Sequence, residues 1–369
     1  MRRDRTGAER LAAETRDAAR VSRRGFLRAG ALGLIGTGLA AAGRVLTRGG
    51  GRGGVPALVG AGSASISGTA AAAATAATAA ASGDAEPASR RGALDPHGFL
   101  TSFDTGRVST LPDGRTLREY EIVAVDREIE IARGVYYPAW TYNGTVPGPT
   151  LRATEGDLLR IHFRNEGAMP HTVHFHGFHP ANMDGVLEVV GRGKEFLYEF
   201  TAEPFGLHLY HCHVMPLRMH IERGLYGTFI VDPKTPRPPM RELVMVMNGY
   251  DTDFDGENEF YTVNGVANCY AEKPIRLRVN EPVRVYLVNV LEHDLVNSLH
   301  IHANFFHLYR TGTSLTPGDF TDTVMLCQGE RAIVEFAYRH PGKFMFHAHQ
   351  SEFAELGWMG FFEVVEGEA

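Results

Sequence analysis

Histidines at alternate positions are the residues of this chain best suited to chemistry. Four His-x-His pairs occur, at His174/His176, His211/His213, His300/His302 and His347/His349. Side chains at positions i and i+2 of a strand share one face, so each pair would direct two imidazoles to the same side of a sheet. The eight imidazoles are enough to hold a cluster of several copper ions.

One of these pairs encloses a cysteine. Cys212 lies between His211 and His213, and on a strand its thiol would face the side opposite to the two imidazoles. The thiolate could bind a second kind of metal site, joined to the imidazole cluster by a few backbone bonds. This arrangement is typical of an oxidase that transfers electrons between two metal sites.

The segments that must position these residues are short and rich in β-forming residues. From Leu94 onwards they are separated by glycine and proline, and no long helical periodicity competes with them. This pattern predicts an all-β sandwich architecture. The expected strands include residues 119–125, 158–163, 227–231, 243–247, 283–288 and 332–338.

An internal repeat divides this region into two halves. In each half an Asn-Gly pair, at 143–144 and at 264–265, precedes two hydrophobic segments and then a His-x-His pair. Each half ends with a second His-x-His pair and a hydrophobic strand. The proline-rich stretch 232–240 separates the halves, so we expect tandem domains over residues 94–235 and 236–369.

The first 93 residues have a different character. Residues 22–27, SRRGFL, resemble a twin-arginine export signal and precede an apolar run at 29–42. Residues 49–93 are mostly Gly, Ala, Ser and Thr, which predicts a flexible linker. We therefore predict a signal region over 1–48, a linker over 49–93, and export to the periplasm or the cell exterior. The cleavage point and a retained membrane tether are left open.

Charge and cysteine content narrow the possible functions. Residues 1–93 hold 14 of the 37 basic and 6 of the 43 acidic residues, which leaves a formal charge of about −14 on the rest. An acidic region of this size argues against nucleic acid as a partner. Three cysteines are too few for a disulfide scaffold. Cys269 and Cys327 could pair in an exported protein or remain buried thiols.

The motifs resemble those of multicopper oxidases. The likeness rests on residues 142–149 (YNGTVPGP), 174–177 (HFHG) and 211–213 (HCH), followed by His220 and Leu225. It covers residues 94–369 and implies two tandem cupredoxin-like Greek-key β-sandwiches with bound copper. It also implies four copper ions per chain, one of type 1 (the blue copper), one of type 2 and two of type 3.

By this resemblance the blue copper belongs to the first domain. His171 precedes His174 by three residues, which is the spacing at which the family supplies one imidazole to the blue site. Cys212 would supply the thiolate and His220 the second imidazole. This set is the one that a blue-copper centre needs.

The residues leave three candidates for the axial position of the blue site. Leu225 occupies it as a non-ligating side chain, which would raise the reduction potential relative to a methionine ligand. His220 follows Cys212 by eight positions, however, instead of the family's usual five or so. The longer loop leaves Met215 and Met219 as alternative axial ligands.

The second domain keeps the histidine pairs and lacks the blue site. Asn297 stands where His171 would be expected and Ala348 where Cys212 would be, and no histidine follows His349. The eight paired histidines would form a trinuclear cluster where a first domain meets a second domain. By the resemblance three chains form a ring, so a homotrimer with clusters between subunits is expected. The residues alone fit assembly within one chain equally well.

The resemblance implies an oxidase with dioxygen as acceptor. A small reducing substrate, such as a phenol, an aromatic amine or a metal ion, would give single electrons to the blue copper, and four electrons would reduce dioxygen to water. Asp184 matches a carboxylate that family members place beside the cluster, and Glu352 and Glu355 are weaker candidates for proton supply. A copper nitrite reductase is the alternative, but the complete His-x-His pairs favour dioxygen.

The other motifs have simpler interpretations. The acidic stretch 251–259 is expected to be a solvated loop, and it resembles a calcium loop only weakly because Thr262 stands at the twelfth position. Phe305 and Phe306 are expected in the core. The remaining histidines are expected to be structural or on the surface: His97, His162, His179, His208, His293, His307 and His340.

Overall fold

The computed structural model describes residues 91–294 and 296–367. The predicted signal and all but the last three residues of the predicted linker lie outside these ranges, so both stay predictions. Arg91 and Gly92, at the end of the predicted linker, form a short strand. None of the helices described is long and apolar enough to cross a membrane.

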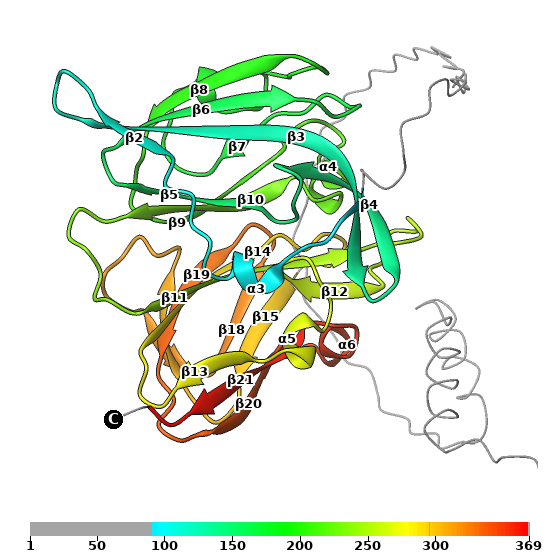
Figure 1. The fold of residues 1–369 in the computed structure, drawn as a ribbon, viewed down its shortest axis with the longest axis vertical. Helices are drawn as coiled ribbons and strands as arrows, with labels where there is room; N and C mark the ends of the chain where they lie inside the picture. Colours follow the sequence, from blue (N-terminus) through cyan, green and yellow to red (C-terminus); the bar gives the residue numbers. More distant parts are fainter. Residues whose placement is uncertain (1–90, 295, 368–369) are drawn as a thin grey trace, which may run out of the picture. The chain divides into compact units, whose positions relative to one another are not determined.

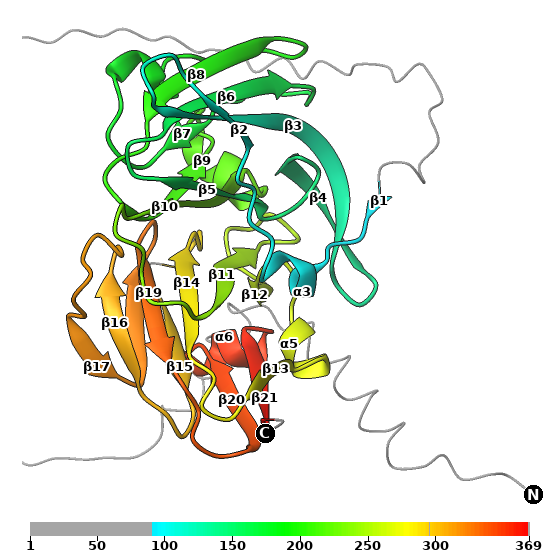
Figure 2. The ribbon, with the colours of Figure 1, turned by 60° about the vertical axis from the view of Figure 1, so that its left-hand side comes forward.

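The first domain is a sandwich of two β-sheets (Figures 1 and 2). Its strands are β1 (Arg91–Gly92), β2 (Arg107–Thr110), β3 (Thr116–Ala132), β4 (Val135–Tyr142), β5 (Gly148–Thr154), β6 (Leu158–Asn165), β7 (His174–Phe175), β8 (Glu195–Thr201), β9 (Gly206–His211) and β10 (Tyr226–Asp232). One sheet has the order β1-β3-β6-β8, with β2 and β4 also paired to β3, and the other has the order β5-β10-β9-β7. Its helices are α3 (Pro96–Phe99), the 3₁₀ helix η2 (Ala181–Met183) and α4 (Leu217–Glu222).

The second domain repeats this plan. Its strands are β11 (Arg241–Tyr250), β12 (Phe260–Val263), β13 (Ile275–Arg278), β14 (Val283–Asn289), β15 (Val296–Ile301), β16 (Phe306–Arg310), β17 (Asp319–Thr321), β18 (Thr323–Cys327), β19 (Arg331–Phe336), β20 (Gly342–His347) and β21 (Met359–Val365). The two sheets have the orders β12-β11-β14-β19-β16-β17 and β13-β21-β20-β15-β18. Two short helices, α5 (Cys269–Glu272) and α6 (Ser351–Glu355), complete it.

The expected all-β fold class is confirmed, and so are the expected strands. Only the last of them ends early, at Phe336 rather than at residue 338. Strand pairing then brings the histidine pairs together, because β7 and β9 are antiparallel with His174 opposite His211. In the same way, β15 and β20 are antiparallel with His300 opposite His347. Directly opposed residues on neighbouring strands have side chains in contact.

Three hydrophobic cores lie within the residues that the structure describes. One belongs to each domain, with Leu100 of domain one added to the core of domain two, and Cys212 and Leu225 are part of the core of domain one. The third core joins the domains, where Ile230 of β10 packs in the same cluster as Val246 of β11 and Val288 of β14. Burial of this apolar surface holds the two domains as one unit.

Ion pairs reinforce the junction between the domains. The Arg152 guanidinium of domain one contacts Asp232 at 2.7 Å and Glu242 of domain two at 2.6 Å. Glu242 also contacts Arg284, which pairs with Glu335 at 2.7 Å. The three carboxylates share two guanidinium groups, so each of these charges, half-buried or buried, has a partner.

Two expectations about individual side chains are resolved. Phe306 is buried, but Phe305 is 49% exposed, so its assignment to the core is wrong. Phe305 precedes strand β16, where consecutive side chains point to opposite sides. Cys269 and Cys327 are free thiols and form no disulfide, and neither is the buried thiol of the other expectation, because Cys269 is half-buried and Cys327 is exposed.

Candidate metal centres

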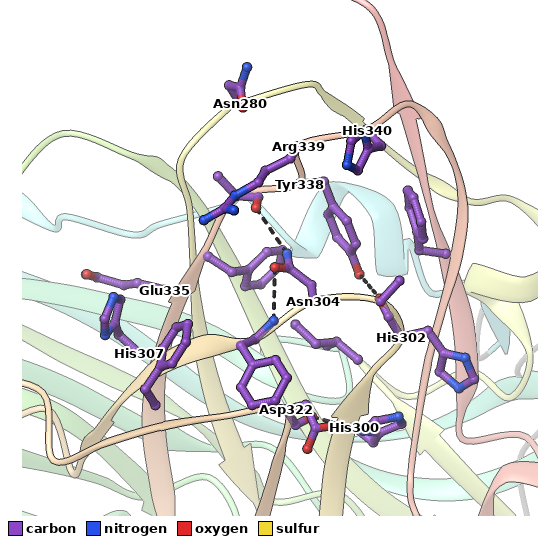
Figure 3. Close-up of a pocket in the computed structure, with 17 residues that line it drawn as sticks. Asn280, His300, His302, Asn304, His307, Asp322, Glu335, Tyr338, Arg339 and His340 are labelled. Atoms are coloured by element: carbon purple, nitrogen blue, oxygen red, sulfur yellow. Dashed lines mark hydrogen bonds between the residues drawn. The ribbon is translucent and has the colours of Figure 1, made fainter.

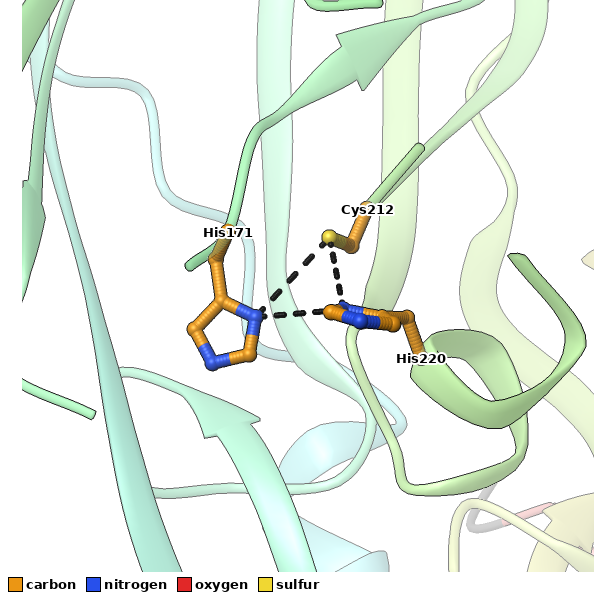
Figure 4. A group of neighbouring side chains, drawn as sticks. All are labelled: His171, Cys212 and His220. Carbon is orange, nitrogen blue, oxygen red and sulfur yellow. Dashed lines mark hydrogen bonds between the residues drawn. The ribbon is translucent and has the colours of Figure 1, made fainter. Parts of the chain in front are cut away.

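Three side chains of domain one converge as a possible metal site (Figure 4). The Nδ1 atoms of His171 and His220 lie 3.2 Å apart, and the Cys212 Sγ lies 3.2 Å from His220 Nδ1 and 3.9 Å from His171 Nδ1. His171 is held by a β-bridge to Val190, Cys212 directly follows β9, and His220 lies in helix α4. The residues predicted to form the blue site are therefore brought together.

Burial sets the charge state of these three groups. Each of their side chains is buried. Desolvation lowers the pKa of His171 to about 3, with a contribution from His220, and the pKa of His220 to about 4. Both imidazoles are thus neutral near pH 7 and can offer Nδ1 to a metal. Burial raises the pKa of the Cys212 thiol, so a bound cation would have to displace its proton.

Two neighbours of this triad were not identified from the sequence. The Thr172 amide donates to Cys212 Sγ at 3.4 Å, and the Thr172 hydroxyl accepts a hydrogen bond from the His213 amide at 3.0 Å. The indole of Trp140 packs at 4.9 Å from the His220 ring and 5.3 Å from the His171 ring. Thr172 adjoins His171 in sequence, but nothing in the sequence pattern marks Trp140.

The candidates for the axial position differ in their surroundings. Leu225 is fully buried in the same core as Cys212, and its carbonyl accepts a hydrogen bond from the Cys212 amide at 3.0 Å. Met215 is 76% exposed, while Met219 lies partly buried in helix α4. Leu225 stays the predicted axial residue, with Met219 the remaining alternative.

Four imidazoles of domain one gather on the other side of β9. The His174 ring contacts the rings of His176, His211 and His213 at centroid distances of 5.1–5.2 Å. The Nε2 atoms of His176 and His211 lie 3.3 Å apart. Burial lowers the pKa of His174, of His176 to about 3 and of His211 to about 4, so these rings are neutral near pH 7. We call this group the domain-one quartet.

Asp184 orients one ring of that quartet. Its carbonyl oxygen lies 2.7 Å from His174 Nδ1 and its carboxylate Oδ1 lies 3.2 Å from the same atom. A ring whose Nδ1 donates to an oxygen presents Nε2 to a metal. His179, expected to be structural or on the surface, has its Nε2 atom 3.7 Å from the same carboxylate oxygen, and this Nε2 donates a hydrogen bond to the Phe175 carbonyl at 2.8 Å. Asp184 is thus beside the quartet, as the resemblance implied.

Domain two carries a matching group, the domain-two quartet. The His300 ring contacts those of His302, His347 and His349 at 5.0–5.4 Å. The Nε2 atoms of His302 and His347 lie 3.0 Å apart. His302 and His349 are exposed to solvent, in contrast to the partly buried or buried rings of the domain-one quartet.

His300 is oriented by a second aspartate, which sequence reasoning missed. Its Nδ1 lies 3.0 Å from the Asp322 carbonyl oxygen and 2.9 Å from the Thr323 hydroxyl. His300, His302 and Asp322 line a cavity of about 910 Å³ (Figure 3). Asp322 repeats in domain two the contact that the Asp184 carbonyl makes in domain one. Glu352 is exposed in the first turn of α6, and its proposed part in proton supply stays a prediction.

The strands that carry the two quartets lie in one sheet of each domain (Figures 1 and 2). The domain-one quartet is built around β7 and β9, and the domain-two quartet around β15 and β20. Neutral imidazole nitrogens 3.0–3.3 Å apart within each quartet suit copper ligation. The buried triad of two imidazoles and one thiol suits copper as well.

Known families and solved structures resemble this chain over most of the described residues. Two multicopper oxidase family models match residues 124–236 and 236–368, which together make up more than half of the chain. A crystal structure of a multicopper oxidase is 58% identical, with a TM-score of 0.73, and the match covers 76% of this chain and 100% of that one. A copper nitrite reductase from Nitrosomonas europaea is 26% identical, with a TM-score of 0.62 and coverage of 68% and 94%.

A curated relative is the copper-containing nitrite reductase of Neisseria gonorrhoeae. It is 30% identical over 246 residues, which cover 61% of this chain and 62% of the relative's length. The chain thus spans less than two thirds of that relative. The family assignment rests instead on the two family models and on the crystal structure matched over its whole length. The chain belongs to the multicopper oxidase family.

Proposed function

We propose that this protein oxidises a small reducing substrate in one-electron steps and reduces dioxygen to water. The main support is the position of Cys212, whose thiol lies in the buried triad while its neighbours His211 and His213 lie in the domain-one quartet. Bound copper would supply the one-electron redox chemistry at both centres. The backbone of residues 211–213 joins the two centres by covalent bonds.

The chain itself prepares the ligands. Burial keeps the imidazoles of His171, His176 and His211 neutral, so no proton has to leave them when a cation binds. Asp184 and the Asp322 carbonyl fix the Nδ1 atoms of His174 and His300 and leave Nε2 for the metal. We propose one type 1, one type 2 and two type 3 coppers per chain, with Asp184 and Glu352 supplying protons.

We further propose that the two quartets meet between copies of the chain, as a homotrimer. Large apolar residues are exposed close in sequence to both quartets. Near the domain-one quartet these are Phe178 (65% exposed) and Leu187 (84%), and near the domain-two quartet Phe305 (49%) and Phe320 (62%). Exposed apolar surface of this kind marks interfaces. Contact between domain one of one copy and domain two of the next would be heterologous, and three such contacts related by a threefold rotation would close a ring.

A copper nitrite reductase is the alternative, and relatives with that activity are among the matches. Both quartets are complete, with four imidazoles in each. The residue after the blue-site cysteine, His213, belongs to a quartet. These features favour dioxygen as the acceptor. The export signal and the place of action, periplasmic or extracellular, are proposed from the sequence alone.

Oxygen uptake by the copper-loaded protein is the direct test. With an excess of an oxidisable phenol, we expect one dioxygen to be consumed per four substrate electrons, without peroxide. Blue, copper-loaded protein that consumes no dioxygen but reduces nitrite would instead establish the alternative.

The homotrimer is tested separately by Phe305→Asp. We expect this change to convert the trimer to monomers, because a buried carboxylate at the interface has no partner. The blue absorption should remain while oxygen uptake is lost. Light scattering with size-exclusion chromatography measures the assembly, and an active, blue monomer would contradict the shared cluster.

A further inference from the structure

Another group of metal-ligating side chains lies outside both copper centres. Glu222, at the end of helix α4 in domain one, lies beside Asp251 and His293 of domain two. His293 Nε2 is 3.2 Å from Glu222 Oε2 and 3.8 Å from Asp251 Oδ2. One ligand atom from each residue lies within 4.8 Å of the other two.

The spacing of these atoms suits a small cation. Ligand bonds of about 2.1 Å in a tetrahedral arrangement hold ligand atoms about 3.4 Å apart. The distances of 3.2 Å and 3.8 Å bracket that value. Asp251 also accepts the Asp255 amide at Oδ1 and the Gly256 amide at Oδ2. Each carboxylate oxygen has two acceptor positions, so Oδ2 keeps one free for a metal.

Charge balance points to a cation independently of the spacing. The side chains of Glu222, Asp251 and His293 are only 9%, 2% and 4% exposed. Among the residues that the structure describes, no lysine or arginine forms an ion pair with either carboxylate. A protonated imidazole would neutralise only one of the two negative charges. Buried charge without a partner is strongly unfavourable, and a divalent cation would balance both carboxylates.

We propose that Glu222, Asp251 and His293 bind a divalent transition-metal cation, separate from the copper centres. One imidazole nitrogen with two carboxylate oxygens suits Mn²⁺, Fe²⁺ or Zn²⁺, whereas Ca²⁺ prefers a shell made of oxygen alone. The site does not depend on the proposed oxidase activity, because none of its three residues belongs to the blue triad or to a quartet.

The cation would connect the two domains beside the buried triad of His171, Cys212 and His220. Glu222 follows His220 by two residues in the same helix, while Asp251 begins the acidic loop 251–259 of domain two. Phe254 of that loop lies 4.2 Å from the guanidinium of Arg223, which in turn lies over Trp140 at 5.6 Å. The loop is therefore not simply solvated, as the sequence suggested, because its first residue is buried against the helix that carries His220.

Metal binding by the copper-saturated protein tests the proposal. Mn²⁺ and Zn²⁺ are added in separate experiments, excess metal is removed by gel filtration, and manganese, zinc and copper are measured per chain. We expect one equivalent of at least one of the two metals, without loss of copper. Asp251→Asn and Glu222→Gln, which keep the side-chain size and remove a charge, should each weaken binding by about 100-fold or more.

Asp253→Asn is the matched control. Asp253 lies in the same loop but is exposed and outside the three-residue group, so this variant should bind the metal as the wild type does. The bound cation should also raise the melting temperature of the wild type and of Asp253→Asn, but not that of Asp251→Asn. If wild-type protein with full copper content binds neither metal more tightly than Asp251→Asn does, the proposal is wrong. Equal binding by all four proteins would also overturn it.

Discussion

The two domains share the same backbone hydrogen bonds around Cys212 and its counterpart Ala348, but the side chains at these matching positions differ. In domain one the Cys212 amide donates to the Leu225 carbonyl at 3.0 Å, and in domain two the Ala348 amide donates to the Trp358 carbonyl at 3.2 Å. Ala348 therefore occupies the position that Cys212 has in domain one, and Trp358 occupies the position that Leu225 has.

Two further hydrogen bonds complete the match. The Leu225 amide donates to the His220 carbonyl at 3.2 Å, and the Trp358 amide donates to the Phe353 carbonyl at 2.8 Å, so Phe353 stands where domain one has His220. The His213 amide donates to the Thr172 hydroxyl, and the His349 amide donates to the Ser298 hydroxyl. Asn297, just before Ser298, therefore matches His171, which precedes Thr172.

Aromatic packing fills the space in domain two that the triad occupies in domain one. Trp358 is fully buried, and its indole N–H donates to Asn297 Oδ1 at 3.0 Å. Phe353 stacks on Tyr261 with ring centroids 3.9 Å apart. The fold is thus compatible with an aromatic core at this position. In domain one the same position holds two imidazoles and a thiol instead of that aromatic packing.

Replacing the Cys212 thiol should remove the blue absorption that we expect from domain one and not from domain two. Cys212→Ser removes the thiolate that makes a copper site of this kind intensely blue, so we expect complete loss of the blue absorption and of substrate oxidation. The quartets have no ligand from this side chain and should keep their copper. Visible absorption and copper content are the measurements, and a retained blue band would contradict the assignment of Cys212.

Removing an imidazole from domain two should have the opposite pattern. His349→Ala should lower dioxygen reduction by at least about 100-fold, because a quartet loses a ligand, and should spare the blue band. His162→Ala is the control, since His162 is exposed on β6 and lies outside both quartets. Unchanged turnover in His349→Ala would remove domain two from the reacting centre.

The packing of domain two can be tested by making it resemble domain one. Trp358→Leu removes a buried indole and leaves Asn297 Oδ1 without its indole donor, so we expect the free energy of unfolding to fall by about 3 kcal/mol. Chemical denaturation measures this loss, and the blue band of the folded protein should not change. A variant as stable as the wild type would show that Trp358 does not replace the metal site by packing.

The strands and the histidine groups could be predicted from the sequence, but the aromatic packing of domain two could not. β-rich segments separated by glycine and proline predicted the strands, and the alternate histidines predicted which imidazoles gather, because strand periodicity places residues i and i+2 on one face. The match of Phe353 and Trp358 to His220 and Leu225 could not be predicted from spacing. His220 follows Cys212 by eight positions, whereas Phe353 follows Ala348 by five. Only the backbone hydrogen bonds show that the longer loop and the shorter loop end at matching positions.

Contacts between segments distant in the sequence could not be predicted from it either. Trp140 reaches the His171 and His220 rings from strand β4. Glu222 meets Asp251 and His293 across the domain junction. No spacing rule connects residues that approach through tertiary packing. The burial of Asp251 could therefore not be predicted, and from its composition the acidic loop 251–259 was expected to be solvated.

The axial position provides the finest test of the match between the domains. If Leu225 holds the place of Trp358, its side chain faces the triad, and Leu225→Met should add a weak sulfur ligand and lower the reduction potential of the blue centre. Met219→Leu should leave the potential unchanged, because Met219 would then have no contact with the metal. Redox titration of the blue band measures both variants. A higher potential in Met219→Leu, with no change in Leu225→Met, would make Met219 the axial ligand. The three extra residues between Cys212 and His220 would then carry a ligand that the short loop of domain two has no room to supply.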